Sequence, residues 1–130
     1  MSKDNRHVNE EYSIIGQNLI ETEPILDYLK GSNVKIIYLE SEKEKKEKGK
    51  IVFGRCEKVQ DKNKWAIDAD YTITLFKPNI EAAEVTDKGI ELVILHELYH
   101  IDDDLSSVRP HDLEDFKFLI DEYGTDWIHA

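Results

Sequence analysis

Residues 90–101 read Ile-Glu-Leu-Val-Ile-Leu-His-Glu-Leu-Tyr-His-Ile, and they place two histidines four positions apart. In an α-helix, His96 and His100 would lie about 40° and about 6 Å apart on one face. Two imidazoles at this spacing can bind one zinc ion, and Glu97 on the flank of that face can act as general base toward a water molecule. The stretch therefore predicts a metal-binding helix with hydrolytic chemistry.

The residues around the motif predict that this helix is buried. Apolar side chains fill most of the run from Ile90 to Leu95 and return at Leu98 and Ile101, so almost no polar face is left. Thr86 or Asp87 can cap the N-terminus, and the acidic run at 102–104 marks the end. The alternative interpretation is a pair of core histidines that only form hydrogen bonds with their neighbours.

A third metal ligand is expected downstream, because a catalytic zinc ion usually has three protein ligands. His111 stands eleven residues after His100 and is the first candidate. Asp112 is ambiguous: it can cap the N-terminus of a last helix, orient a ligating imidazole, or bind the metal directly. Asp115 and the aspartates at 102–104 are the remaining alternatives.

Two segments resemble those of the phage metallopeptidases, which are similar to very small members of the zincin group. The first is His-Glu-Leu-Tyr-His-Ile at 96–101, and the second is Arg-Pro-His-Asp-Leu-Glu-Asp-Phe at 109–116. A strand-like stretch at 70–75 precedes them, so the resemblance covers roughly residues 50–120. A lysine-rich insertion at 41–50 and the three consecutive aspartates after the motif depart from the pattern.

This resemblance implies a metal-dependent peptidase-like domain. Carried over by position, the metal ligands would be His96, His100 and His111, and Glu97 would be the catalytic residue. The departures from the pattern affect loop geometry more than they affect these ligands.

The remaining patterns predict an α+β fold, in which a small, mostly antiparallel or mixed sheet packs on the HExxH helix in a minimal zincin-like arrangement. The expected elements are a helix at 11–30 broken near Pro24, strands at 34–39, 51–59 and 65–76, the motif helix, and a last helix from Asp112. If the strand that ends near Phe76 lies at the sheet edge, it could bind an extended peptide by strand addition; the alternative is a core strand.

Length and composition indicate a single domain over residues 1–130, with residues 1–10 as a flexible N-terminal arm. The 17 basic and 28 acidic residues give a net charge of −11, which disfavours nucleic acids and anionic membranes as partners. No apolar stretch approaches the roughly 20 residues of a membrane span, and no signal peptide is evident, so a cytoplasmic location is expected. Cys56 is the only cysteine, which excludes an intramolecular disulfide and a thiolate zinc cluster.

The function predicted from these observations is zinc-dependent hydrolysis of a peptide or protein substrate, with Glu97 as general base. The alternatives are a metal-stabilised binding or regulatory module of phage or host origin, and a zinc hydrolase with another substrate. Glu97 favours an enzyme, because a structural zinc site needs no general base and usually has four protein ligands. Tyr71, Tyr99 or Tyr123 could donate to the oxyanion, and the sequence does not choose among them.

Overall fold

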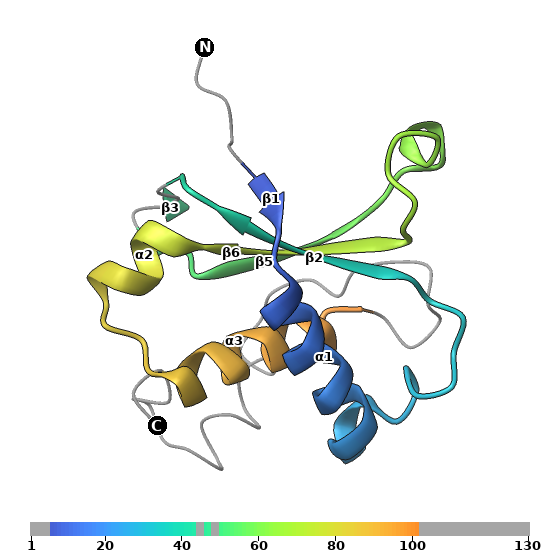
Figure 1. Ribbon diagram of the computed structural model, residues 1–130, viewed down its shortest axis with the longest axis horizontal. Helices are drawn as coiled ribbons and strands as arrows, with labels where there is room; N and C mark the ends of the chain where they lie inside the picture. Colours follow the sequence, from blue (N-terminus) through green and yellow to red (C-terminus); the bar gives the residue numbers. More distant parts are fainter. Residues whose placement is uncertain (1–5, 44–45, 48–49, 102–130) are drawn as a thin grey trace.

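The computed structural model describes residues 6–43, 46–47 and 50–101, and its centre is a mixed four-stranded sheet (Figure 1). The strand order is β1, β2, β6, β5. β2 and β6 are parallel, whereas β1 with β2 and β5 with β6 are antiparallel. The bounds are β1 (Arg6–Val8), β2 (Ile36–Ser41), β5 (Gly54–Lys58) and β6 (Tyr71–Phe76), and a separate hairpin joins β3 (Lys46–Glu47) to β4 (Lys50–Ile51).

The two longest helices of the described residues lie on the same side of this sheet, as Figure 1 shows. They are α1 (Glu10–Thr22) and α3 (Asp87–Tyr99), and α3 contacts α1, β5 and β6. Shorter elements are η1 (Pro24–Leu26) after α1, η2 (Asp61–Asn63) between β5 and β6, and α2 (Lys77–Ala82) after β6. The predicted α+β fold, with a small mixed sheet packed on the motif helix, is confirmed.

β6 is the most buried strand, and every one of its six residues is buried. Tyr71, Ile73 and Leu75 have no exposed surface and belong to the hydrophobic core. The strand lies between β2 and β5, so the alternative that placed it at the sheet edge is wrong. Its parallel pairing with β2 is a long-range contact that no local sequence pattern indicates. Within the described part of the chain, β5 is the edge strand beside it.

The first helix ends where the sequence predicted a break. Asn9 caps α1, because its side chain accepts a hydrogen bond of 3.0 Å from the N–H of Tyr12. Pro24 lacks an N–H group and begins the short 3₁₀ turn η1 instead of continuing α1. Gly31 then adopts φ 75°, a left-handed conformation that glycine tolerates and that helps the chain turn toward β2.

Residues 6–8 differ from the flexible arm expected over residues 1–10. They form β1 and pair with β2 through His7 opposite Glu40 and Val8 opposite Leu39. All three residues of β1 are exposed, so the strand is formed by backbone pairing and leaves no apolar alternation in the sequence. Residues 1–5 lie outside the described residues.

The strand expected at 65–76 is shorter than predicted, because residues 61–70 form an ordered loop that projects from the sheet (Figure 1). Trp65 in this loop is 88% exposed. The helix α2 was not predicted, although Pro78 at its start is a known helix-start signal.

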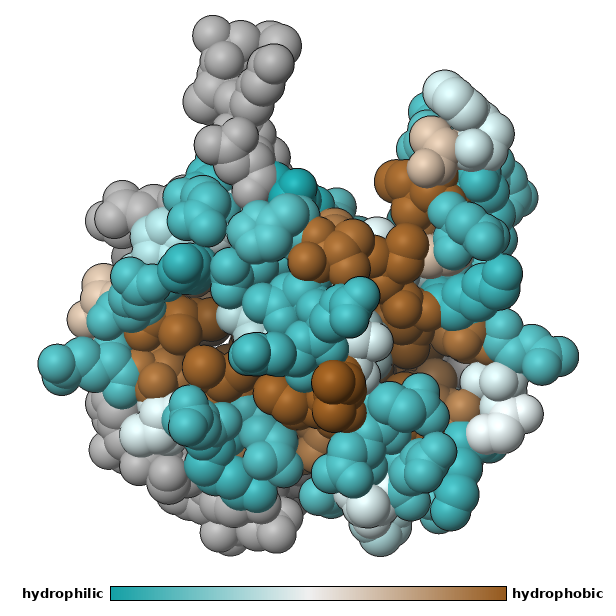
Figure 2. Space-filling view, viewed as in Figure 1, coloured by the Kyte–Doolittle hydropathy of each residue, from teal (hydrophilic) through white to brown (hydrophobic). Residues whose placement is uncertain are grey.

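Figure 2 shows hydrophilic side chains over much of the face in view, with hydrophobic patches between them. None of the helices in the described ranges is long and apolar enough to cross a membrane.

Candidate metal centre

The helix that carries the candidate site begins at Thr86, one of the two cap residues that the sequence allowed. The Thr86 side chain accepts a hydrogen bond of 3.0 Å from the N–H of Gly89, and Asp87 places a negative charge in the first turn. The residues from Leu92 to Leu95, together with Leu98, are at most 3% exposed. The helix is therefore buried on nearly all sides, and its polar motif residues lie inside the protein.

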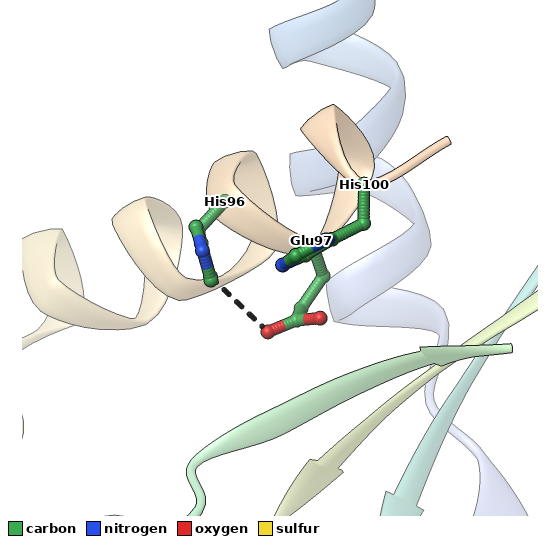
Figure 3. Close-up of side chains that lie close together, drawn as sticks. All are labelled: His96, Glu97 and His100. Atoms are coloured by element: carbon green, nitrogen blue, oxygen red, sulfur yellow. Dashed lines mark ion pairs between the residues drawn. The ribbon is translucent and has the colours of Figure 1, made fainter. Parts of the chain in front are cut away.

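His96, Glu97 and His100 come together at the C-terminal end of α3, and Figure 3 shows their side chains converging near β5. One potential ligand atom from each residue lies within 4.8 Å of the other two. The imidazole rings are 4.6 Å apart at their centroids and nearly perpendicular, at 78°. His96 Nδ1 is 3.3 Å from Glu97 Oε2. The helical spacing therefore produces the predicted cluster.

Burial makes this cluster chemically unusual. His96, Glu97 and His100 are 4%, 2% and 2% exposed. Glu97 Oε1 and the two Nε2 atoms are buried and form no hydrogen bond within the described residues. A buried polar atom without a hydrogen bond costs about 1–3 kcal/mol. Imidazole nitrogens and carboxylate oxygens are common zinc ligands, so this donor set fits a metal ion.

The edge strand β5 passes very close to Glu97. A Cβ atom built on Gly54 would lie 3.0 Å from Cγ1 of Val93, 3.1 Å from Cγ of Glu97 and 3.4 Å from its Oε2. Only glycine allows this approach without displacing a neighbour. Gly54 was not among the site residues predicted from the sequence, although a glycine inside a strand pattern is a recognised signal of close backbone approach.

Cys56 lies on the same strand and is buried in the core. Burial raises the pKa of its thiol well above the ordinary value, and the negative charges of Glu97 and Glu57 raise that pKa further. The thiol therefore stays protonated at neutral pH and is a poor metal ligand or nucleophile. This agrees with the sequence, in which no nucleophile motif surrounds the residue.

The candidates for the third ligand all lie outside the described residues: His111, Asp112, Asp115 and the aspartates at 102–104. They stay predictions. Among the tyrosines considered for the oxyanion, Tyr71 is fully buried and Tyr99 is half-buried, while Tyr123 also lies outside the described residues.

A second group of metal-ligand side chains lies at the pairing of β1 with β2. It consists of His7, Glu40 and Glu42, of which His7 and Glu42 are exposed and Glu40 is partly buried. The Glu40 carboxylate accepts hydrogen bonds from Tyr12 Oη at 3.0 Å and from Asn9 Nδ2 at 3.3 Å, and it lies 3.1 Å from His7 Nε2. Hydrogen bonding thus accounts for Glu40, the partly buried member of this group, without a metal ion.

Comparison with known proteins supports the sequence resemblance. No curated protein and no solved structure matches the chain. A family model does match, and it covers residues 6–130, a range that includes both the described cluster and the segment of the expected third ligand. The chain therefore belongs to the family described as "Putative phage metallopeptidase".

Proposed function

We propose that this protein is a zinc-dependent peptidase in which His96, His100 and His111 bind the metal ion and Glu97 is the general base. The family name implies a metal ion and a peptidase. The observation that carries the proposal is the buried cluster of two imidazoles and one carboxylate within 4.8 Å on α3. A catalytic zinc site with three protein ligands and one open position accounts for the spacing of His96 and His100 and requires one further ligand, for which His111 is proposed.

The chemistry of the cluster assigns a separate task to Glu97. When bound, zinc supplies a Lewis acid that lowers the pKa of water and stabilises negative charge on a carbonyl oxygen. Glu97 accepts the proton of the attacking water and delivers it to the leaving amine. Its burial favours this role, because a carboxylate in a site of low dielectric constant interacts strongly with the charges that develop beside it.

The substrate is proposed to bind along β5. Val59 N–H donates to Asp70 O at 2.8 Å, and Phe76 N–H donates to Phe53 O at 2.9 Å, so these residues form hydrogen-bonded pairs of the antiparallel ladder. Pairs of this kind alternate along a strand, and the intervening residues direct their N–H and C=O groups away from the partner strand. The outward-facing backbone groups of β5 therefore belong to Gly54, Cys56 and Lys58.

An extended peptide that pairs with these backbone groups would lie as a fifth strand beside β5. Because Gly54 is the residue that approaches Glu97, the bond to be cleaved lies at the Gly54 end of β5. Main-chain hydrogen bonds to β5 would hold the peptide without a deep pocket, which suits a domain of this size. The strand addition expected from the sequence is thus proposed for β5 instead of β6.

The test of this function is the substitution Glu97→Gln. Glutamine keeps the shape of the side chain but removes the group that accepts a proton, so zinc binding is retained and peptide cleavage falls at least 10²-fold, the lower end of the usual range of about 10²–10⁴ for general-base catalysis. Zinc content is measured by elemental analysis, and cleavage is measured on a broad peptide pool. Glu91→Gln removes a charge from the same helix outside the cluster and serves as the matched control.

Equal cleavage by wild type and Glu97→Gln would contradict the role of Glu97. If neither protein cleaved any peptide but both retained zinc and bound the same protein partner with equal affinity, the binding-module alternative would replace this proposal.

A further inference from the structure

The end of α3 coincides with one of the proposed metal ligands. The helix ends at Tyr99, and His100 occupies the C-cap position. The N–H groups of His100 and Ile101 donate to the carbonyl oxygens of Glu97 and Leu98, each at 3.1 Å, so the chain closes with 3₁₀-type bonds to the third residue back. The last carbonyl groups of a helix have no partner within the helix, and helix ends fray. A metal ligand at this position therefore needs support from outside the helix.

Tyr28 supplies this support from a distant part of the chain. Its hydroxyl donates to the backbone carbonyl of Ile101 at 2.5 Å and lies 3.4 Å from the carbonyl oxygen of Leu98. These two carbonyls are on either side of His100 in the sequence. Tyr28 follows η1, whose Leu26 is fully buried, and Leu29 N–H donates to Leu26 O at 2.9 Å. The hydroxyl is thus presented by a turn that is anchored in the core.

We propose that Tyr28 is a positioning residue for the metal centre: its hydroxyl holds the last turn of α3 so that the His100 imidazole stays beside His96 and Glu97. This proposal rests on the proposed function insofar as His100 binds zinc. Without the hydroxyl, the helix end frays in the zinc-free protein, and zinc must order that turn when it binds. The loss of one such hydrogen bond corresponds to a decrease in zinc affinity of roughly five- to tenfold.

The first experiment compares Tyr28→Phe with Tyr12→Phe in the full chain. Both variants keep the aromatic ring and lose one hydroxyl, but the Tyr12 hydroxyl donates to Glu40, outside the cluster. Zinc dissociation constants are measured by competition with a chelating dye. We expect the zinc dissociation constant of Tyr28→Phe to be roughly five- to tenfold higher than that of wild type. The dissociation constant of Tyr12→Phe should equal that of wild type. Both variants should lower the melting temperature, because each loses one hydrogen bond. If Tyr28 had only this structural role, the two variants would have the same zinc affinity.

A second measurement needs no zinc. Amide hydrogen exchange in the zinc-free wild type should show that His100 and Ile101 are protected, because their N–H groups lie in a turn that Tyr28 holds closed. In Tyr28→Phe these two amides should exchange faster, while those at 92–95 in the middle of the helix keep the wild-type rates. Added zinc should restore the protection in the variant.

Wild-type zinc affinity in Tyr28→Phe would overturn the proposal, and so would unprotected His100 and Ile101 amides in the wild type. A wild type that binds no zinc is a different result, because it would overturn the proposed function. The exchange rates would then still decide whether Tyr28 holds the end of α3.

Discussion

At the scale of single residues, the protein buries a carboxylate and two imidazoles in a helix whose other buried side chains are apolar. Burial of these polar groups costs stability. Glu97 is 2% exposed, and its Oε1 makes no hydrogen bond within the described ranges. Leaving such an atom without a partner costs about 1–3 kcal/mol, a large fraction of the 5–15 kcal/mol that typically stabilises a domain. A metal ion that binds the folded state offsets this cost through its binding free energy.

The third ligand can be tested directly, because His111 and Asp112 are expected to respond differently. His111→Ala should weaken zinc binding strongly, since it removes one of the three proposed protein ligands. Asp112→Ala should cost about 1 kcal/mol of stability as a lost helix cap, or cause a smaller loss of affinity. Competitive zinc titration of both variants, with elemental analysis of wild type for about one zinc per chain, makes the comparison.

The opposite pattern, in which Asp112→Ala loses zinc and His111→Ala keeps it, would show that the aspartate is the ligand. Less than a tenth of an equivalent of zinc in wild type, with none regained on titration, would contradict the metal centre as a whole.

At the scale of secondary-structure elements, the contact between β5 and α3 depends on a missing side chain. Gly54→Ala would place a methyl group 3.0 Å from Val93 and 3.1 Å from Glu97, so the strand and the helix must separate by a few tenths of an ångström. We expect a loss of stability of about 1–3 kcal/mol, as is typical of overpacking. We also expect slower peptide cleavage than the loss of folded protein explains, because Glu97 and β5, where the substrate is proposed to bind, are displaced together.

Thermal denaturation and cleavage rates at a temperature where both proteins are folded provide the measurement. Glu57→Ala is the control, because Glu57 lies on the same strand, its backbone groups face β6 instead of the proposed substrate, and its side chain is 41% exposed. If Gly54→Ala changed neither stability nor cleavage, the close contact between β5 and α3 would not be required for either.

The elements differ in how far the sequence predicts them. The motif helix was predicted, and Thr86 was one of the two cap candidates beside Asp87, because helical periodicity and capping depend on residues within a few positions of one another. The break at Pro24 was predicted for the same reason. β1 and the short extent of β6 were not, because exposed backbone pairing and an ordered polar loop leave no periodic apolar pattern.

The candidate site divides in the same way. His96, Glu97 and His100 follow from the spacing on one helix. Gly54 and Tyr28 act from other elements, and their roles depend on which strand lies at the edge and on which turn packs against the end of α3. Such long-range neighbours are set by the tertiary fold and have no local signature, apart from the glycine within a strand.

At the scale of the whole molecule, Asp70 connects three parts of the chain at the end of the sheet. Its carboxylate accepts hydrogen bonds from Lys35 N–H at 2.9 Å, just before β2, and from Lys64 Nζ at 3.1 Å, in the loop that precedes β6. The hydrogen bond from the Lys35 backbone, together with the bond from Lys64, lowers the pKa of Asp70 below its ordinary value of 3.8. The folded state therefore favours the ionised form of the Asp70 carboxylate.

This lowered pKa predicts how stability changes with pH. The contribution of Asp70 is fully present above its ordinary pKa and is lost as the pH falls below that value through the folded-state pKa. Asp70→Asn should thus be less stable than wild type at pH 7, and the difference should shrink as the pH is lowered toward about 3. Urea denaturation across this pH range measures it.

Asp61→Asn is the control for that experiment, because the Asp61 side chain is 95% exposed and its distance to Lys64 is longer, at 3.7 Å. It should change stability little at any pH. A difference between Asp70→Asn and wild type that stays constant from pH 7 to pH 3 would contradict the assigned role of the Asp70 charge.

In the part of the chain that the structure describes, β5 lies at the edge of the sheet, and this position also bears on whether copies of the protein associate. Outward-directed backbone groups can pair with any extended segment, and the β5 strand of another copy is one such segment. The net charge of −11 opposes such an encounter, because two like-charged molecules repel each other at long range. Dissolved salt limits the range of that repulsion to about 10 Å at 0.1 M and to about 3 Å at 1 M. The excess of acidic residues therefore opposes self-association through β5, and it does so less strongly as the salt concentration rises.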